Sequence, residues 1–460
     1  MSARQAIAAV AERFVEFDED VVSSDPLGWP GYTAQRARAR ARSGESESVV
    51  CGHARIGSTD VAIIAFDFAF MGGSMGEATG RKITNAFARA RAARQPVVTL
   101  VASGGCRMQE GMRSLVQMQR IAAAVHELRA AGVPHVSVVR SPTTGGVWAA
   151  LAAGADVVLA RRDATVAFAG RRVRNQDARD EEAFTSEGKL AAGHVDLLVD
   201  DSELQPTLAV LLDMLTIARS VPPAPADVPS ALGRGDLPPD GWSAVQRARD
   251  PERPRAQAYL ERYFDARVPV SGDRAGGSDA GMLCGIGRRQ GRPIAYAAQS
   301  GTANTPAGFR TAARLIRLAD RLNLPILTLI DTPGAANDAA AERGGVGTAI
   351  AELLAAVAGA RVPITTLVIG EGGSGGALAL ASPTDLWITP DAYFAVIAPE
   401  GATAILKHDP GEAATIADRL RLRPQDLLEL GIVRGIARPP TLRHGGPEAG
   451  RAVARPAGSQ

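Results

Sequence analysis

The sequence has few cysteines and no long apolar run, and these shortages limit what the protein can be. Its 460 residues include only Cys51, Cys106 and Cys284, which are too few and too dispersed for a disulfide framework. No C-x-x-C pair is present to hold zinc, so we expect no metal. No apolar run approaches the ~18 residues of a membrane span, and the N-terminus is polar where a secretory signal is apolar. The sequence therefore predicts a cytoplasmic protein with no membrane partner.

Several motifs of catalytic and phosphate-binding proteins are also missing. The six histidines are scattered, and the sequence contains neither a G-x-S-x-G nucleophile motif nor a G-x-x-x-x-G-K-[ST] phosphate loop. The 51 basic and 49 acidic residues nearly balance, which argues against nucleic acid as the partner. With 46% hydrophobic residues the chain can bury a large core. This inventory suits chemistry that uses backbone hydrogen-bond donors and no resident protein base.

An internal repeat is the main feature that the sequence does contain. The apolar segments 96–102 and 134–139 each run into glycines and then into a helical stretch, and segments 325–330 and 363–369 repeat this plan. The matching landmarks are Pro96 and Pro325, 229 residues apart, Pro134 and Pro363, also 229 apart, and Gly145 and Gly375, 230 apart. Because a repeat at a fixed offset indicates a duplicated architecture, we expect two copies of one domain.

The repeat unit predicts the fold class and the domain boundaries. Apolar strands that alternate with helices favour parallel pairing with both sheet faces covered, which is α/β layering. We place the first domain at 1–220, a proline-rich linker at 221–240, the second domain at 241–438 and a mobile tail at 439–460. The basic and then acidic segment Ala34–Ser48 is predicted to be a solvated helix face or surface loop, less ordered than its surroundings.

Glycine-rich turns between strand and helix are the candidate sites. The pairs Gly145-Gly146 and Gly375-Gly376, the latter followed by Ala377, precede helices whose first amides have no intrahelical acceptor. Such amides favour an oxyanion, and glycine allows a substrate to approach the backbone. The alternative is that these glycines only permit tight packing. For the turns 72–76 and 103–105 taken alone, a purely structural role is the better interpretation.

A competing motif is present in the second half. Residues 370–375, GEGGSG, fit the G-x-G-x-x-G pattern of dinucleotide-binding folds after a strand and before a helix. The pattern comes late in its half, and the corresponding segment SPTTGG of the first half lacks it. Dinucleotide binding is therefore the weaker interpretation, and a titration with NAD(P) would test it.

Several longer motifs resemble one enzyme family. The segments FMGGSMG, ASGGCRMQE, PTTGG and FAG resemble the β subunit of the bacterial acetyl-CoA carboxylase carboxyltransferase. The segments LIDTPGA, IGEGGSGGALA and PEGA resemble its α subunit, so the chain is similar to β fused to α. The resemblance implies a crotonase-type (ClpP/crotonase) ββα-spiral fold in each half, a homo-oligomer, and an active site between the N-terminal half of one protomer and the C-terminal half of another.

The resemblance also implies a reaction and a set of site residues. Carboxybiotin, attached to a separate carrier protein that works with a biotin carboxylase, would deliver its carboxyl group to the α-carbon of an acyl-CoA. No Met-Lys-Met occurs in this chain, so biotin is not expected to be attached to it. The N-terminal catalytic pair maps to Gly145 and Gly146, which would stabilise the thioester enolate, and the C-terminal pair to Gly376 and Ala377, which would hold the biotin ureido oxygen. Substrate-binding positions follow as Gly72, Gly73, Met75, Gly104, Gly105, Arg107, Trp148, Gly170, Gly334, Gly375 and Ala379.

Three features depart from the family pattern. The four-cysteine zinc ribbon of the β subunit is missing, Trp148 stands where the family has a small residue, and residues 336–346 differ from the family after Ala335. The leading hypothesis is a carboxyltransferase that converts acetyl-CoA to malonyl-CoA. A malonyl-thioester decarboxylase and a non-catalytic acyl-CoA-binding paralogue are the alternatives.

Overall fold

The chain folds into two compact units, and each is described separately. The computed structural model describes residues 1–170, 180–217, 223–440 and 453–454. The N-terminal unit comprises Met1–Arg219 together with Val270–Gly277, and the C-terminal unit comprises Ser220–Pro269 and Ser278–Gln460. The segment Val270–Gly277 therefore belongs to the first unit although it lies within the second half of the sequence. Most of the tail predicted at 439–460 lies outside the described residues.

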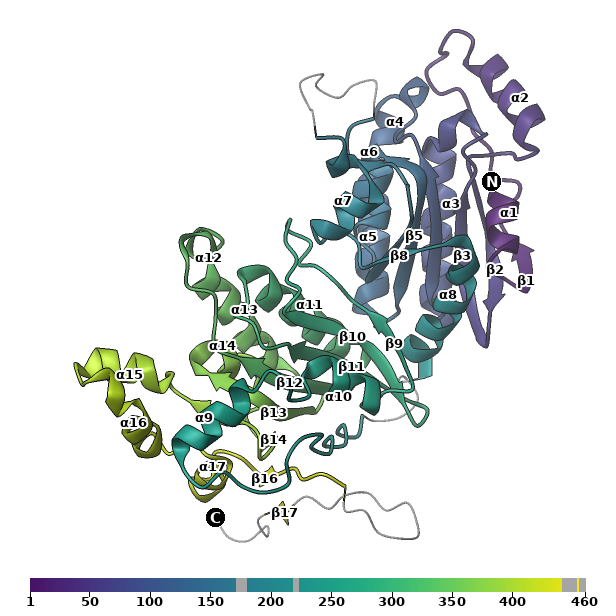
Figure 1. Cartoon of the computed structure of the whole chain (residues 1–460). Helices are drawn as coiled ribbons and strands as arrows, with labels where there is room; N and C mark the ends of the chain where they lie inside the picture. The colour runs from purple at the N-terminus through teal and green to yellow at the C-terminus, as the bar shows by residue number, and fades with distance from the viewer. Residues whose placement is uncertain (171–179, 218–222, 441–452, 455–460) are drawn as a thin grey trace. The chain divides into compact units, whose positions relative to one another are not determined.

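The N-terminal unit is built on one mixed sheet with strand order β1-β2-β3-β4-β5-β6-β8, and β7 pairs with β5 (Figure 1). The first three strands pair antiparallel, and the strands from β3 onward pair parallel. In chain order its elements are α1 (Ala3–Ala8), β1 (Arg13–Glu16), α2 (Tyr32–Ser43), β2 (Val49–Ile56), β3 (Thr59–Phe66), η1 (Met71–Gly73), α3 (Glu77–Ala93), β4 (Val97–Ser103), η2 (Met108–Glu110), α4 (Met112–Leu115), α5 (Gln117–Ala130), β5 (His135–Thr144), α6 (Gly145–Val147), η3 (Trp148–Ala152), β6 (Val157–Arg161), β7 (Val166–Ala167), η4 (Glu182–Phe184), α7 (Ser186–Ala191), β8 (Leu197–Val199) and α8 (Asp201–Ile217), where η marks a short 3-10 or π helix.

The C-terminal unit repeats this plan with strand order β17-β16-β14-β13-β12-β11-β10-β9, and β15 pairs with β13. The central strands β11 to β14 again pair parallel. In chain order its elements are α9 (Gly241–Arg249), α10 (Ala256–Tyr263), β9 (Ala266–Pro269), β10 (Met282–Arg289), β11 (Arg292–Gln299), α11 (Pro306–Leu322), β12 (Ile326–Thr332), α12 (Ala339–Arg343), α13 (Val346–Gly359), β13 (Ile364–Gly373), α14 (Ser374–Leu378), β14 (Leu386–Ile388), β15 (Tyr393–Ala395), α15 (Pro399–Leu406), η5 (Pro410–Glu412), α16 (Ala413–Arg419), α17 (Pro424–Glu429), β16 (Gly435–Ile436) and β17 (Val453–Ala454).

The central elements of the two units match in length and spacing. The helices α3 and α11 both have 17 residues and start 229 positions apart, and each ends at a residue in the left-handed region, Arg94 (φ 53°) and Asn323 (φ 60°). The strands β4 and β12, and likewise β5 and β13, also match at an offset of 229. The α/β fold with parallel central strands, predicted from the repeat, is confirmed.

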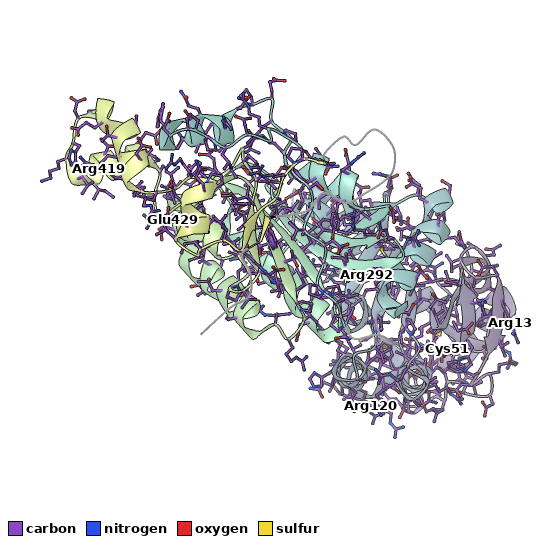
Figure 2. The ribbon with its side chains drawn as sticks, turned by 90° about the horizontal axis from the view of Figure 1, so that it is seen from below. Arg13, Cys51, Arg120, Arg292, Arg419 and Glu429 are labelled. Atoms are coloured by element: carbon purple, nitrogen blue, oxygen red, sulfur yellow. The ribbon has the colours of Figure 1, made fainter. Side chains whose placement is uncertain are left out.

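The core of the N-terminal unit explains why these segments form these elements. Strand β4 is buried along its whole length, because a parallel strand is covered on both faces. Helix α3 buries Ile83, Ala86, Phe87 and Ala90, which share one face at the i, i+3, i+4, i+7 spacing of an amphipathic helix. The side chains in Figure 2 place Cys51 inside this unit and Arg13 and Arg120 at its surface. Among the described residues, no helix is long and apolar enough to cross a bilayer.

The prediction for Ala34–Ser48 is partly wrong. Residues 32–43 form the regular helix α2, which buries Tyr32 and Ala39. The acidic end of the segment is buried as well, because Glu47 and Ser48 are fully enclosed. Only the outward side of α2 is a solvated helix face. In the segment predicted to be a linker, the described residues 223–240 contain no helix or strand.

Candidate active site

Glycine turns from three parts of the N-terminal unit meet at the carboxyl ends of β4 and β5. The Gly104 amide donates a hydrogen bond to the carbonyl of Gly72 (2.8 Å). A Cβ atom added to Gly145 would lie 3.0 Å from the Cα atom of Gly105. Gly145 has a φ of 67°, in the left-handed region where glycine is the least strained residue. The structure therefore brings together four of the predicted site residues through contacts between backbones.

A hydroxyl at the end of the strand fixes each of these turns in both units. The Ser103 hydroxyl donates to the Gly73 carbonyl (2.6 Å) and accepts from the Gly105 amide (3.1 Å). In the C-terminal unit the Thr332 hydroxyl donates to the Thr302 carbonyl (2.8 Å) and accepts from the Gly334 amide (3.0 Å). Ser103 and Thr332 were not among the predicted site residues. The signal that could have found them is a hydroxyl at the same offset of 229 in both halves.

The structure changes which amides of the N-terminal turn can bind an oxyanion. The Gly145 amide already donates to the Phe168 carbonyl (2.9 Å), so it is engaged within its own unit, and its role as an oxyanion donor stays a prediction. Gly146 is the second residue of α6, and an amide at this position has no acceptor within the helix. Of the predicted pair, Gly146 is therefore the candidate donor.

The C-terminal turn needs a similar correction. The strands β5 and β13 have ten residues each and are 229 positions apart, so the structural partner of Gly145 is Ser374 and that of Gly146 is Gly375. Ser374 has the same left-handed conformation, with φ 55°. Helix α14 has Gly373 as its N-cap, so Gly375 and Gly376 are its second and third residues, where backbone amides have no acceptor within the helix. Gly375 and Gly376 are therefore the candidate donors, and oxyanion binding by the Ala377 amide stays a prediction.

Gly376 is packed against the neighbouring turn in the C-terminal unit. A Cβ atom on Gly376 would lie 2.5 Å from the backbone nitrogen of Ala335 and 2.9 Å from the carbonyl carbon of Gly334. The Gly376 carbonyl accepts a hydrogen bond from the Gln299 side chain (3.0 Å), which is buried. In contrast, a Cβ atom on Gly375 would have no neighbour within 4 Å. We call the backbone at the start of α14 the cradle. It is fixed by the contacts of Gly376 and has free space beside Gly375.

Arg107 is enclosed by charged and polar groups of its own unit. Its side chain is wholly buried and forms ion pairs with Glu47 (2.5 Å) and Glu110 (3.1 Å). It also donates to the Ser74 carbonyl (2.7 Å), which ties the turn after Gly73 to η2. Burial opposes the ionisation of Glu47, but the Arg107 charge and hydrogen bonds from Arg107 and Ser23 outweigh it and lower the pKa of Glu47. These contacts hold the glycine turn in position, and contact of Arg107 with a substrate stays a prediction.

The other predicted substrate-binding residues differ in their exposure. The side chains of Met75 and Ala379 are fully buried, and substrate binding at these two positions stays a prediction. Trp148 is half-buried against the core of its unit and starts the π helix η3, in which its carbonyl accepts from the Ala153 amide (2.9 Å). Gly170 has no neighbour that a Cβ atom would meet within 4 Å. For Trp148 and Gly170, substrate binding stays a prediction.

The structure excludes the dinucleotide interpretation of residues 370–375. The first three glycines of that motif lie within strand β13, where a dinucleotide fold would have the turn after a strand. Gly370 is packed against Arg253 and Asp331, and Gly372 against Phe394. These glycines leave room for side chains of their own unit and do not form a phosphate-binding loop.

The titratable groups offer little nucleophilic or metal-binding chemistry. Burial raises the pKa values of Cys51 and Cys284 to about 12, and burial also raises the pKa of half-exposed Cys106 despite a hydrogen bond from Ser114. Burial lowers the pKa of His135 to about 4. Within the described ranges, no group of three His, Cys, Asp or Glu side chains could hold a metal ion.

Comparison with solved structures identifies the fold of the two units. The transcarboxylase 12S, whose crystal structure is described as a hexamer with hydrolysed methylmalonyl-CoA bound, superimposes with a TM-score of 0.79 at 22% identity, covering 95% of this chain and 87% of that one. A single-chain, multi-domain long-chain acyl-CoA carboxylase superimposes with a TM-score of 0.73 at 20% identity, covering 95% and 44%. The two units therefore share the tandem crotonase-like fold of these proteins.

Sequence comparison then gives the family. Residues 31–196 match the carboxyl transferase domain, and residues 239–450 match the domain described as acetyl co-enzyme A carboxylase carboxyltransferase-like. The acetyl-coenzyme A carboxylase carboxyl transferase subunits beta/alpha of Salinispora arenicola are 40% identical over 98% of this chain and 85% of the relative. A probable biotin-dependent acyl-coenzyme A carboxylase beta3 subunit of Mycobacterium bovis is 36% identical over 92% and 86%. The chain belongs to the family of biotin-dependent acyl-CoA carboxyltransferases in which the beta and alpha parts are fused.

Proposed function

We propose that this carboxyltransferase transfers the carboxyl group of carboxybiotin to acetyl-CoA and forms malonyl-CoA. The observation that supports the proposal is the twice-built glycine turn at the carboxyl ends of the central strands, with candidate donors at Gly146 in one unit and at Gly375 and Gly376 in the other. Backbone donors aimed at a developing oxyanion contribute a large share of catalysis in acyl-transfer enzymes. Relatives named for acetyl-CoA carboxylation support acetyl-CoA as the acceptor.

The two units would divide the reaction between them. The Gly146 amide would stabilise the enolate oxygen of the acyl-CoA thioester, and the Gly375 and Gly376 amides would hold the ureido oxygen of biotin. The bond between the biotin nitrogen and the carboxyl carbon breaks as a bond to the α-carbon forms, and the α-proton ends on that nitrogen. This assignment needs no protein base.

The partners follow from the same proposal. Biotin would arrive on a separate carrier protein that a biotin carboxylase loads. The N-terminal unit of one protomer would face the C-terminal unit of another in a homo-oligomer, and the hexameric assembly of the transcarboxylase 12S supports an oligomer of this kind.

The direct test is carboxyl transfer with purified components. The chain is incubated with biotin carrier carboxylated with ¹⁴C, and separately with acetyl-CoA, propionyl-CoA and butyryl-CoA, and labelled acyl-CoA is counted. We expect transfer to acetyl-CoA to be the fastest, with uncarboxylated carrier as the blank. Faster transfer to a longer acyl-CoA would contradict the substrate assignment, and absence of transfer to all three would contradict the reaction.

Gln299 gives a prediction that is specific to the biotin side. Replacing Gln299 by methionine removes the donor to the Gly376 carbonyl and frees the start of α14 to shift, so we expect about a tenfold lower rate of carboxyl transfer. The KM for acyl-CoA should stay within about twofold, because acyl-CoA is assigned to the other unit. Steady-state kinetics with each substrate varied in turn measure the two effects. The control is Gln257→Met, since Gln257 is exposed and bonds only Glu261 in its own helix.

A further inference from the structure

Helix α2 concentrates positive charge that the chain does not neutralise. The helix alternates alanine with Arg36, Arg38, Arg40 and Arg42, in a protein whose basic and acidic residues nearly balance. Among the described residues, no carboxylate forms an ion pair with any of these four arginines, whereas the nearby Arg107 has two carboxylate partners. Four adjacent uncompensated guanidinium groups raise the local positive potential and attract anions.

The helix is held firmly in place. Tyr32, at its start, is fully buried and donates to the Glu110 carboxylate (2.5 Å), and Ala39 is buried two turns later. The Arg36 guanidinium donates to the Ser23 carbonyl (2.6 Å). The arginines are therefore presented on a fixed scaffold, which favours a specific ligand over diffuse attraction.

The four arginines lie on two flanks of the helix. At 100° per residue, Arg38 and Arg42 lie one turn apart on the same flank as Gln35, and Arg36 and Arg40 lie on the opposite flank. Arg42 donates from Nε to the Ala69 carbonyl (3.1 Å), and Gln35 accepts from the Gln109 side chain (3.1 Å). We call the side formed by Gln35, Arg38 and Arg42 the Arg38 flank. This flank faces the segments around Ala69 and Gln109. Arg38 is exposed between Gln35 and Arg42, which are bonded to those segments.

The Arg38 flank adjoins the glycine turns of the candidate active site. Phe68, next to Ala69, has its ring edge 4.0 Å from the position of a Cβ atom on Gly72, and 41% of the residue is exposed. Gly72 is bonded to Gly104, and the loop around Gln109 follows the same turn. A ligand that reaches the glycine turns can thus also meet an exposed aromatic ring and two arginines.

We propose that the Arg38 flank binds the phosphates of the nucleotide end of CoA, and that the exposed face of Phe68 contacts the adenine ring. This proposal rests on the proposed function, because it takes the N-terminal unit as the acyl-CoA unit. CoA combines a diphosphate and a 3′-phosphate with a planar base, and arginine matches phosphate in charge and in hydrogen-bond geometry. Aromatic side chains provide a stacking surface for a base. The rest of the CoA molecule would extend from this flank toward Gly72 and Gly146.

Binding measurements on matched variants test the proposal. The affinity for CoA, for 3′-dephospho-CoA and for adenosine 3′,5′-bisphosphate is measured by calorimetry with the wild type, Arg38→Gln and Arg40→Gln. Arg40 is the control, because it is exposed on the same helix but on the opposite flank. We expect Arg38→Gln to weaken CoA and the bisphosphate about 5- to 10-fold, as when one charge-assisted hydrogen bond at a partly exposed site is lost, and Arg40→Gln to stay within about twofold. Higher ionic strength should reduce the difference.

Three results would overturn the proposal. Equal affinities of Arg38→Gln and the wild type for CoA would exclude a phosphate contact at Arg38. Equal weakening of CoA binding by Arg38→Gln and Arg40→Gln would indicate diffuse attraction. Loss of binding to a labelled oligonucleotide in Arg38→Gln, with CoA binding unchanged, would indicate nucleic acid as the ligand.

The outcome is separable from that of the proposed function. Binding of CoA is measured without turnover, so a loss on Arg38→Gln supports the flank even if no carboxyl transfer is found. If transfer occurs, Arg38→Gln should raise the KM for acetyl-CoA about 5- to 10-fold and leave the KM for acetyl-pantetheine, which lacks the nucleotide, unchanged. An equal rise for both acceptors would contradict a role at the phosphates.

Discussion

Replacing Gly376 by alanine is expected to lower kcat/KM for carboxyl transfer by at least about 100-fold. The added methyl group would lie 2.5 Å from the Ala335 nitrogen and 2.9 Å from the Gly334 carbonyl carbon, and both atoms belong to backbone that cannot rotate away. The start of α14 would then have to move away from the turn, and a displacement of about 1 Å at a catalytic group costs on the order of 100-fold in rate. Steady-state transfer from carboxylated carrier to acetyl-CoA measures the effect.

A second glycine in the same unit provides the control for this experiment. Gly347, in the first turn of α13, has no neighbour within 4 Å of a Cβ atom and a backbone conformation that alanine adopts freely. We expect Gly347→Ala to retain full activity and to match or slightly exceed the wild-type stability. Wild-type activity in Gly376→Ala, with a circular dichroism spectrum like that of the control, would contradict the role of this cradle.

Replacing Arg107 by leucine is expected to destabilise the N-terminal unit by about 3–5 kcal/mol. The substitution leaves the carboxylates of Glu47 and Glu110 without their cation in a site that excludes water, which is far more costly than losing an exposed pair. Urea unfolding, followed by a probe in the N-terminal unit, measures the loss.

An exposed ion pair in the same unit provides the comparison for Arg107. Arg113 pairs with Glu77 (3.1 Å), and their side chains are 60% and 36% exposed. Because exposed pairs contribute about 0–1 kcal/mol, Arg113→Leu should change the stability little. Similar losses for the two variants would show that the Arg107 network does not stabilise the unit through its charges.

The repeat made most of the fold predictable from the sequence. Buried parallel strands are nearly continuous in apolar residues, so segments 96–102 and 325–330 could be identified as strands before their neighbours were known. The prolines that precede them, Pro96 and Pro325, gave the offset of 229 that the structure has in β4, β5 and their counterparts. Duplication carries this information because both copies must keep the same strand lengths to form the same sheet.

The structure brings the predicted glycine turns together, but it pairs their residues between the two units differently from the sequence pattern. The sequence alignment paired Gly145 with Gly375 because both are the first glycine of a pair. The structure pairs Gly145 with Ser374, since a left-handed residue is needed at that position and serine adopts it at φ 55°. Which amide already has an acceptor, such as Gly145 with Phe168, depends on tertiary contacts that no local pattern encodes.

The burial of Arg107 and the ordered helix α2 were not predicted from the sequence, for a related reason. An arginine in a motif next to a glycine turn was predicted to face a substrate, but its partners Glu47 and Glu110 come from distant and near parts of the chain and enclose it. The Arg-Ala alternation of α2 has no apolar stripe, and the buried contact of Tyr32 with Glu110 is what orders the helix. Long-range pairing of charged residues is invisible to composition and periodicity.

The segment Val270–Gly277 has a consequence for how the two halves of the gene can be divided. These eight residues are encoded downstream of α9, α10 and β9 yet pack with the first unit, where Arg274 forms an ion pair with buried Asp196 and the Ser271 amide donates to the same carboxylate (3.0 Å). A cut anywhere between 220 and 269 would place Asp196 on the first polypeptide and its partners Ser271 and Arg274 on the second. The first polypeptide would then lack these contacts to Asp196. The first unit is therefore completed by a segment from the second half of the chain. Dividing the chain into two separate genes would require moving Val270–Gly277 into the first gene as well as inserting a stop codon.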